Sequence, residues 1–278
     1  MRFRPLDLIL APALCLCLLL FSQPSQAVAV CPGVSATCLS GQGDWADTLE
    51  ARSLDGGATI GAYYDSALNI TWLADANYAN TSGFTSGLTP SNGTLSFTTA
   101  NAWANSLDIN GFTGWRLPTM TDVGGNGCDF SNAGGTDCGY NVLVSSELAH
   151  MFYVTLGDKS KCTPGDGGCF PNQPGAGLTN AGPFANLQAD FYWTNLPYAP
   201  EPTNFAWNFD FSNGNQFRDS QTDKDDNFAW AVIDGSVGVS FTSPPPDPVP
   251  LPASAWLLLS GLLGMLMLSR RSRHVRIM

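Results

Sequence analysis

Four aspartates in one short stretch of the chain could together bind a divalent cation. They are Asp219, Asp223, Asp225 and Asp226. Ca²⁺ in proteins prefers about six to eight oxygen ligands, carboxylates among them, so this stretch is a candidate calcium site. The stretch lacks the spacing and the glycine of an EF-hand loop, and a solvated acidic loop is the alternative interpretation. Calcium is the one cofactor that the sequence leaves open.

A second candidate for chemistry is the pair Glu147 and His150. These residues are three positions apart, so their side chains could touch if this segment is helical. We expect a structural contact, because no nucleophile accompanies the pair. The sequence also has no phosphate-binding glycine loop and no zinc-type cluster of cysteines and histidines. It therefore predicts a non-catalytic protein, with an uncharacterised hydrolase or modifying enzyme as the alternative.

The cysteines indicate disulfide chemistry. Six of them follow the apolar N-terminal segment: Cys31, Cys38, Cys128, Cys138, Cys162 and Cys169. An even number of cysteines in an oxidising compartment is typical of disulfides. The six fall into three close pairs along the sequence, and we expect each cysteine to bridge to its neighbour. Metal binding is the alternative, which a single histidine in residues 28–243 makes weak.

The N-terminal segment has the order of parts of a secretory signal peptide. Arg2 and Arg4 precede an apolar run from Leu8 to Phe21, and small residues follow this run. A signal peptidase needs such small residues, and we expect cleavage after Ala27. Residues 1–27 would then be removed, and residues 28–243 would form the exported region. An uncleaved anchor helix is the alternative, although the apolar run is short for one.

The C-terminal tail is predicted to cross a membrane. Residues 251–269 carry no charged side chain, and they are followed directly by Arg270, Arg271, Arg273 and Arg276. At ~1.5 Å per residue, a helix of this length can span roughly 30 Å of hydrocarbon. The arginines favour a cytoplasmic C-terminus. The proline-rich residues 244–248 form a stiff spacer before this segment.

The same tail resembles a PEP-CTERM sorting signal of Gram-negative bacteria, in its VPLPA variant. The resemblance covers residues 249–278 and rests on the apolar span, the arginine cluster and the motif Val249, Pro250, Leu251 and Pro252. It implies processing by exosortase-type sorting machinery, delivery to the cell envelope or extracellular matrix, and an association with exopolysaccharide. Leu251 departs from the pattern, because the name-giving motif has an acidic residue there. A plain C-terminal membrane anchor is the alternative.

The exported region is strongly acidic. It contains 21 of the 23 acidic residues but only half of the 12 basic ones, which gives a net charge of about −15. Nucleic acids and anionic polysaccharides bind through lysine and arginine, so both are disfavoured as ligands. The region is also long enough for one domain with a real hydrophobic core. Its many glycines, asparagines and aromatic residues predict a loop-rich domain that contains β-structure.

Hydrophobic periodicity predicts the elements that would position these residues. Short apolar runs between Thr48 and Leu73 are typical of β-strands. Apolar residues recur at helical spacing from Phe97 to Leu107 and again from Ser146 to Leu156. We expect Ser145 to cap the second of these helices and Gly157 to end it.

The C-terminal third is predicted to return to strands. Aromatic residues alternate there with polar ones at Phe205, Trp207, Phe209 and Phe211. This alternation predicts a strand with one aromatic face and one polar face. Asn213-Gly214 predicts a tight hairpin turn after it, and Phe228 to Val232 predicts a last strand. We expect the aromatic residues to form the core.

The most distinctive motif of the exported region is Trp115-Arg116-Leu117-Pro118-Thr119. Arg116 can stack on an aromatic ring and direct its guanidinium at a buried carboxylate or at carbonyls. Pro118 fixes the backbone that follows. We therefore interpret the motif as an architectural corner, with contact to a ligand as the less favoured role.

This motif and three other segments resemble the DUF1566 family, also called the Lcl C-terminal domain. The supporting segments are Leu68–Trp72, Tyr192–Thr194 and Phe228–Val232. The resemblance covers residues 63–234 and implies a C-type-lectin-like α+β fold, with two short helices, an antiparallel sheet and long disulfide-stapled loops. Family members usually end in a strand with an arginine, where this chain has Val232-Ile233-Asp234. Binding of sulfated glycans, associated with adhesin members, would also require a basic surface.

Together these features predict an exported, non-catalytic binding or structural protein of an exopolysaccharide or biofilm matrix. A calcium-dependent carbohydrate-binding protein is an alternative of a different kind. The expected partners are the sorting machinery, an extracellular polysaccharide, and the membrane before the tail is processed. No nucleic-acid partner is expected.

Overall fold

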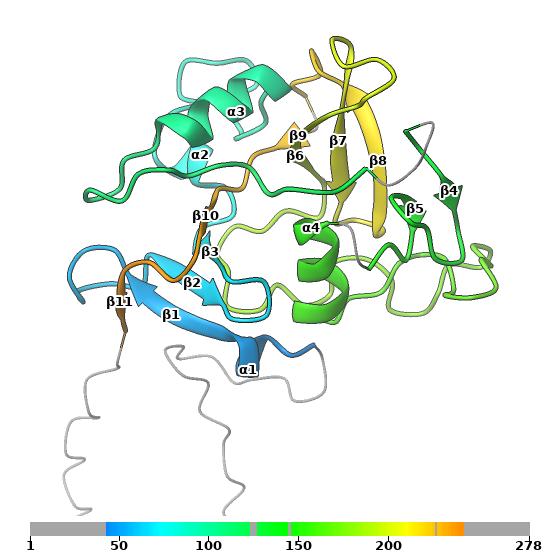
Figure 1. The fold of residues 1–278 in the computed structure, drawn as a ribbon, viewed down its shortest axis with the longest axis horizontal. Helices are drawn as coiled ribbons and strands as arrows, with labels where there is room; N and C mark the ends of the chain where they lie inside the picture. The colour runs from blue at the N-terminus through cyan, green and yellow to red at the C-terminus, as the bar shows by residue number, and fades with distance from the viewer. Residues whose placement is uncertain (1–42, 123–126, 144–145, 226, 242–278) are drawn as a thin grey trace, which may run out of the picture.

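The structure, a computed structural model, describes residues 43–122, 127–143, 146–225 and 227–241. Several predicted features lie outside these residues: the signal peptide (1–27), Cys31 and Cys38, Asp226, the spacer (244–248) and the sorting signal (249–278) with its apolar span. Within the described ranges, no helix combines the length and the hydropathy that crossing a bilayer requires. The described part begins and ends on the same side of the molecule, at the bottom of Figure 1.

The first sheet has five strands in the order β10-β3-β2-β1-β11. Its strands are β1 (Leu49–Ser53), β2 (Ala62–Asp65), β3 (Ile70–Leu73), β10 (Val232–Asp234) and β11 (Val239–Ser240). All neighbouring strands in this sheet are antiparallel. The first three follow one another along the chain, as the apolar runs between Thr48 and Leu73 predict. The C-terminal strands β10 and β11 then flank them on both sides.

The second sheet has six strands in the order β4-β5-β8-β7-β6-β9. Its strands are β4 (Phe130–Ser131), β5 (Cys138–Tyr140), β6 (Phe191–Pro197), β7 (Phe205–Asp210), β8 (Asn215–Ser220) and β9 (Asn227–Phe228). The pairs β4–β5 and β6–β9 are parallel, and the other three are antiparallel. Strands β7 and β8 form the predicted hairpin, but its turn covers residues 211–214 and is longer than the predicted tight turn. Gly214 has a positive φ of 78°, whereas Asn213 does not have a positive φ.

Both predicted helices are present, together with two single-turn helices, α1 (Trp45–Thr48) and α2 (Tyr78–Thr81). Helix α3 spans Phe97–Ser106, within one residue of its predicted end. The second predicted helix is α4 (Glu147–His150), which continues as a π-helical turn, η1 (Met151–Thr155). Its cap is Ser146 and not Ser145, because the Ser146 hydroxyl accepts a hydrogen bond from the Ala149 amide.

The prediction of one continuous last strand from Phe228 to Val232 is wrong. Strand β9 ends at Phe228 in the six-stranded sheet, and β10 starts at Val232 in the five-stranded sheet. The three residues between them pass from one sheet to the other, so this segment joins the two sheets (Figure 1). Trp230 lies in this crossing and is completely buried. The apolar alternation therefore marks a buried crossing, which has the same sequence pattern as a strand.

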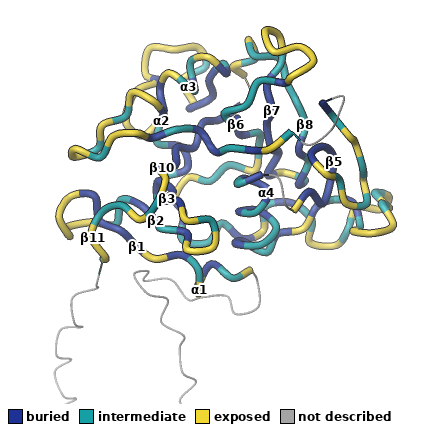
Figure 2. The backbone as a smooth tube through the Cα atoms, viewed as in Figure 1, coloured by how far each residue is buried: buried dark blue, intermediate teal, exposed yellow. Residues whose placement is uncertain are grey.

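The core is aromatic and lies between the two sheets, as the dark blue segments of Figure 2 show. Trp72, Trp193, Trp230, Tyr192 and Phe209 are among its fully buried side chains. The predicted aromatic face is buried at Trp207 and Phe209 of β7 and at Phe211 just after it, whereas Phe205 at the start of β7 is only half-buried.

The polar face predicted for β7 is not on the surface. Asn208 and Asp210 on that face are buried, and the Asn208 amide donates to the Asn227 side chain at 2.9 Å. Hydrogen bonding inside the protein allows polar groups to be buried, which the alternation of residues along the strand does not reveal.

The elements described above give an α+β fold class, with short helices, two sheets and disulfide-stapled loops.

Candidate functional site

The Trp115–Thr119 motif lies between the two sheets and α4. Trp115 and Leu117 are buried, and the Trp115 indole donates to the Phe112 carbonyl at 2.9 Å. Arg116 exchanges two backbone hydrogen bonds of 2.8 Å with Val232 of β10. The carbonyl of Pro118 accepts from the Asn195 amide of β6. The motif thus ties its own segment to strands of both sheets.

The side chain of Arg116 completes this corner through two carboxylates. Its terminal nitrogens bind both oxygens of Glu147 at 2.9 Å, and one of them also binds Asp234 at 2.6 Å. Glu147 accepts a third hydrogen bond from the Thr119 amide at 2.7 Å. Burial acts to lower the pKa of Arg116, but the hydrogen bonds and negative charge of Glu147, with a smaller effect of Asp234, outweigh it and raise that pKa.

These contacts place Arg116 in a structural role, as the motif predicts. Its guanidinium is directed at a largely buried carboxylate, and the side chain of Glu147 is only 12% exposed. Glu147 therefore turns to Arg116 and Thr119, not to His150 as the helical spacing allows. His150 instead has its Nδ1 atom 3.3 Å from the Thr155 hydroxyl. The contacts of Trp115, Arg116 and Pro118 are thus all with other residues of the fold.

Two of the three predicted disulfides are present among the described residues. Cys128 bridges Cys138, and Cys162 bridges Cys169, in the sequential pairing that the spacing predicts. The two stapled loops also contact each other, because the Gly165 amide donates to the Ala133 carbonyl at 2.7 Å.

Replacing Cys162 and Cys169 together by serine should lower the free energy of unfolding by about 2 kcal/mol, because the reduced loop gains freedom in the unfolded chain. Chemical denaturation of the variant and of the parent protein, both monitored by circular dichroism, measures this difference. Equal unfolding midpoints and slopes would contradict a stabilising role of the bridge.

The acidic stretch that begins at Asp219 in β8 does not gather its described carboxylates around one point. Asp219 accepts hydrogen bonds from the Ser220 amide and the Asn227 side chain, and Asp223 accepts one from the Asp225 amide. No group of three or more potential metal-ligating side chains is found in the described ranges, and Asp226 lies outside them. These hydrogen bonds support the alternative interpretation of a solvated acidic loop.

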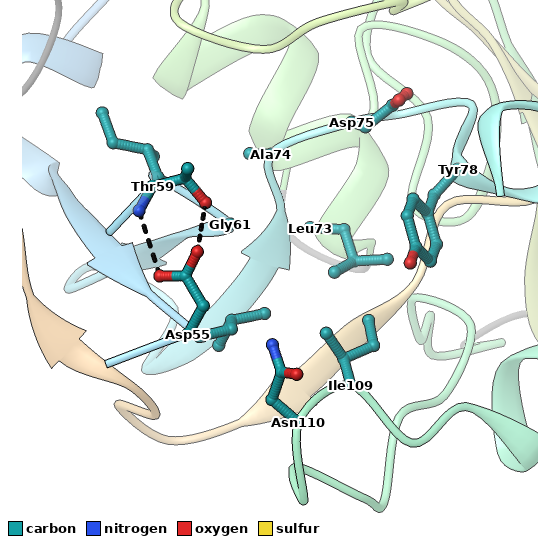
Figure 3. Close-up of a pocket in the computed structure, with 11 residues that line it drawn as sticks. Asp55, Thr59, Gly61, Leu73, Ala74, Asp75, Tyr78, Ile109 and Asn110 are labelled. Carbon is teal, nitrogen blue, oxygen red and sulfur yellow. Dashed lines mark hydrogen bonds between the residues drawn. The ribbon is translucent and has the colours of Figure 1, made fainter. Parts of the chain in front are cut away.

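A surface pocket of about 240 Å³ is the best candidate site for a ligand. One wall is the segment after β1, with Leu54, Asp55 and Thr59, and the other is the Ile109–Asn110 turn (Figure 3). The end of β3 and the Tyr78 ring of α2 close it. The pocket is therefore built by three segments that are distant in the sequence, with apolar groups between polar ones.

The turn beside the pocket has a well-defined geometry. Ile109 and Phe112 exchange two backbone hydrogen bonds of 3.1 and 3.0 Å around Asn110 and Gly111. Both central residues have positive φ, 54° and 90°, as a type I′ turn requires. This turn holds the Asn110 side chain at the pocket, where its amide reaches into the space beside Ile109 (Figure 3).

The two carboxylates of the pocket, Asp55 and Asp75, are bound to other residues of the protein. Asp55 accepts hydrogen bonds from Ser53 and Thr59, which lower its pKa well below the usual value for an aspartate. Asp75 accepts from Thr81 and Asn186 and points away from Leu73 and Ile109 in Figure 3. Both carboxylates therefore hold the walls in place.

Asn110 and Tyr78 are the groups that remain for a ligand. Neither the amide of Asn110 nor the hydroxyl of Tyr78 makes a hydrogen bond with another residue of the described part. Sequence reasoning did not identify this pocket, because its walls meet only in the folded chain. The Asn110-Gly111 dipeptide is the one local signal, since such turns display their side chains at the surface.

The arrangement is suited to holding a small, uncharged, partly polar molecule. Leu54, Leu73 and Ile109 offer apolar contact, and the free amide and phenol can donate and accept hydrogen bonds. Comparison of the chain with protein-family models, with curated proteins and with solved structures found no match.

Proposed function

We propose that this chain is an exported, non-catalytic protein of the cell envelope or extracellular matrix that binds neutral carbohydrate in the pocket of Figure 3. The observation that carries the proposal is the pairing of two free polar side chains, Asn110 and Tyr78, with an apolar floor. A sugar ring presents hydroxyls to such donors and acceptors and C–H groups to an aromatic face. The net charge of the exported region, about −15, favours a neutral sugar over a polyanion.

The sequence resemblances support the proposed setting. A Lcl C-terminal domain with a C-type-lectin-like fold is consistent with the α+β architecture and the disulfide-stapled loops. A PEP-CTERM signal in residues 249–278 would deliver the domain through exosortase-type machinery to a polysaccharide-rich exterior. The ligand would then be a neutral residue of that exopolysaccharide. One small pocket gives weak binding, so we expect dissociation constants in the millimolar range. Many protein copies bound to one polysaccharide chain would together bind it more tightly.

A glycan-binding measurement on the full chain tests the proposal. The protein is purified in a detergent without a sugar headgroup and screened against neutral oligosaccharides. We expect Tyr78→Ala and Asn110→Ala each to weaken binding about tenfold, since each removes a hydrogen bond or ring contact of the ligand. Circular dichroism checks that both variants stay folded.

Matched controls are available away from the pocket. Phe170→Ala removes an aromatic side chain that is 95% exposed, and Asn105→Ala removes an exposed amide from α3. Both should bind like the parent protein. If no neutral glycan binds, or if the pocket variants bind as well as these controls, the proposed function is wrong.

A further inference from the structure

Arg218 in β8 differs from the other two arginines of the described part. Arg52 is paired with Glu50, and Arg116 is paired with Glu147 and Asp234. Arg218 makes no ion pair and no hydrogen bond through its side chain with any described residue. A half-buried guanidinium without an acceptor is unusual in a region with a net charge of about −15.

Three aromatic rings surround the Arg218 guanidinium. Its central carbon lies 4.5 Å from the ring centre of Tyr198, 4.9 Å from that of Phe217 and 5.8 Å from that of Phe205. These distances are typical of cation–π contacts, which fix the plane of the guanidinium. We call Arg218 and these three rings the Arg218 platform.

Only one side of the guanidinium is closed off. Its Nε atom is buried without an acceptor, whereas the two terminal nitrogens, which also lack a partner in the described part, are not among the buried atoms. The terminal nitrogens therefore keep some contact with solvent, while the rings pack against the guanidinium. This leaves a pair of parallel donors at the surface, the geometry that a carboxylate accepts through both oxygens.

The platform stands on regular structure. Arg218 is the direct cross-strand neighbour of Trp207 in β7, and the Trp207 ring packs against Tyr198 at 5.4 Å. Phe205 begins β7, and Phe217 precedes Arg218 in β8. Strand pairing thus sets the relative positions of three of the four side chains before any ligand arrives, which lowers the entropic cost of binding.

We propose that the Arg218 platform is a second ligand site, and that its ligand is the carboxylate of a hexuronate sugar. The terminal nitrogens bind the carboxylate, and the edges of the half-buried Phe205 and Phe217 rings contact the C–H groups of the sugar ring. The Tyr198 ring is buried and packs against the guanidinium instead. A free carboxylate such as acetate gains only the first contact, and a neutral hexose gains only the second. The site shares no residue with the pocket of Figure 3, so it can be tested independently of neutral-sugar binding.

The charge of the domain determines how the site should be tested. A long polyuronate is repelled by the net negative charge, and the repulsion masks a local contact at low salt. A monosaccharide with one charge avoids most of this repulsion. The probe is therefore sodium glucuronate, compared with glucose and with sodium acetate at the same ionic strength.

The experiment follows the Arg218 Nε–H signal of the full-length ¹⁵N-labelled protein by NMR during each titration. We expect glucuronate to shift this signal and to bind about tenfold more tightly than glucose or acetate. Arg218→Gln should remove the preference for glucuronate, and Arg218→Lys should retain only part of it, because a lysine lacks the paired planar donors. Lys159→Gln removes one charge from an exposed side chain and is the matched control, expected to bind like the parent protein.

Three results would overturn the proposal. They are an unmoved Arg218 signal in the unmodified protein, equal affinity for glucuronate and acetate, and tighter binding of a glutamate-containing peptide than of glucuronate. The first needs no variant, so it decides the matter even if Arg218→Gln does not fold. Loss of neutral-glycan binding in Tyr78→Ala leaves this site unaffected, which separates the two proposals.

Discussion

Replacing Glu147 with alanine is expected to lower the free energy of unfolding by about 3 kcal/mol. Three hydrogen bonds end on this carboxylate, two from the Arg116 guanidinium and one from the Thr119 amide. The substitution leaves a largely buried arginine, whose side chain is 22% exposed, without its main partner. The cost of an uncompensated buried charge exceeds the net contribution of the pair itself. Urea denaturation, with the slope compared between proteins, measures the loss.

Asp234 provides a control in the same network. It also binds Arg116, at 2.6 Å, but its side chain is 80% exposed. Exposed ion pairs contribute about 0–1 kcal/mol, so Asp234→Asn should cost less than about 1 kcal/mol. If Glu147→Ala and Asp234→Asn destabilise the protein equally, the burial of Glu147 does not explain the loss of stability. The Arg116–Glu147 pair would then contribute no more to stability than an exposed ion pair.

Local patterns in the sequence predicted the local structure well. Helical spacing after Ser96 identified α3, and the Asn213-Gly214 dipeptide identified the β7–β8 hairpin. The short spacing within Cys128–Cys138 and Cys162–Cys169 favoured the pairings found. In each case, the residues that decide the structure lie within about one turn or one loop of each other. Such signals survive without knowledge of the rest of the chain.

Contacts between distant segments could not be predicted in this way. Arg116 and Glu147 are 31 positions apart, and the helical spacing suggested His150 as the partner of Glu147 instead. The pocket walls meet only because β3 and the Ile109–Asn110 turn are brought to the segment after β1. The contacts of Arg218 with Phe205 of β7 and with Tyr198 in the loop before β7 likewise form only in the folded chain.

The crossing between the sheets shows the same limit. Phe228, Trp230 and Val232 alternate as in a strand, yet β9 and β10 belong to different sheets. Periodicity reports which side chains are buried, and burial on both sides of a crossing gives the same pattern as burial on one face of a strand. Of the residues in this crossing, we expect Trp230 to contribute most to the stability of the protein.

Trp230→Ala is expected to destabilise the protein by about 4 kcal/mol, because it leaves a large cavity in a core that cannot close over it. The Trp230 ring packs at 4.6 Å against Trp72 of β3 and at 4.7 Å against Phe184, and it also contacts Tyr192 of β6. Its indole nitrogen donates to the Leu73 carbonyl at 2.9 Å. One side chain therefore contacts both sheets, and its loss should lower the cooperativity of unfolding as well as the midpoint.

Two further variants separate the contributions. Trp230→Phe keeps most of the packing but leaves the Leu73 carbonyl without its donor, and it should cost about 1–2 kcal/mol. Phe170→Ala deletes an aromatic ring that is 95% exposed and should change stability by less than about 0.5 kcal/mol. Thermal and urea denaturation of all three variants measures their order of stability. If Trp230→Ala is no less stable than Phe170→Ala, the two sheets are not held together through Trp230, because a fully buried ring that joins them has to cost more than a free one.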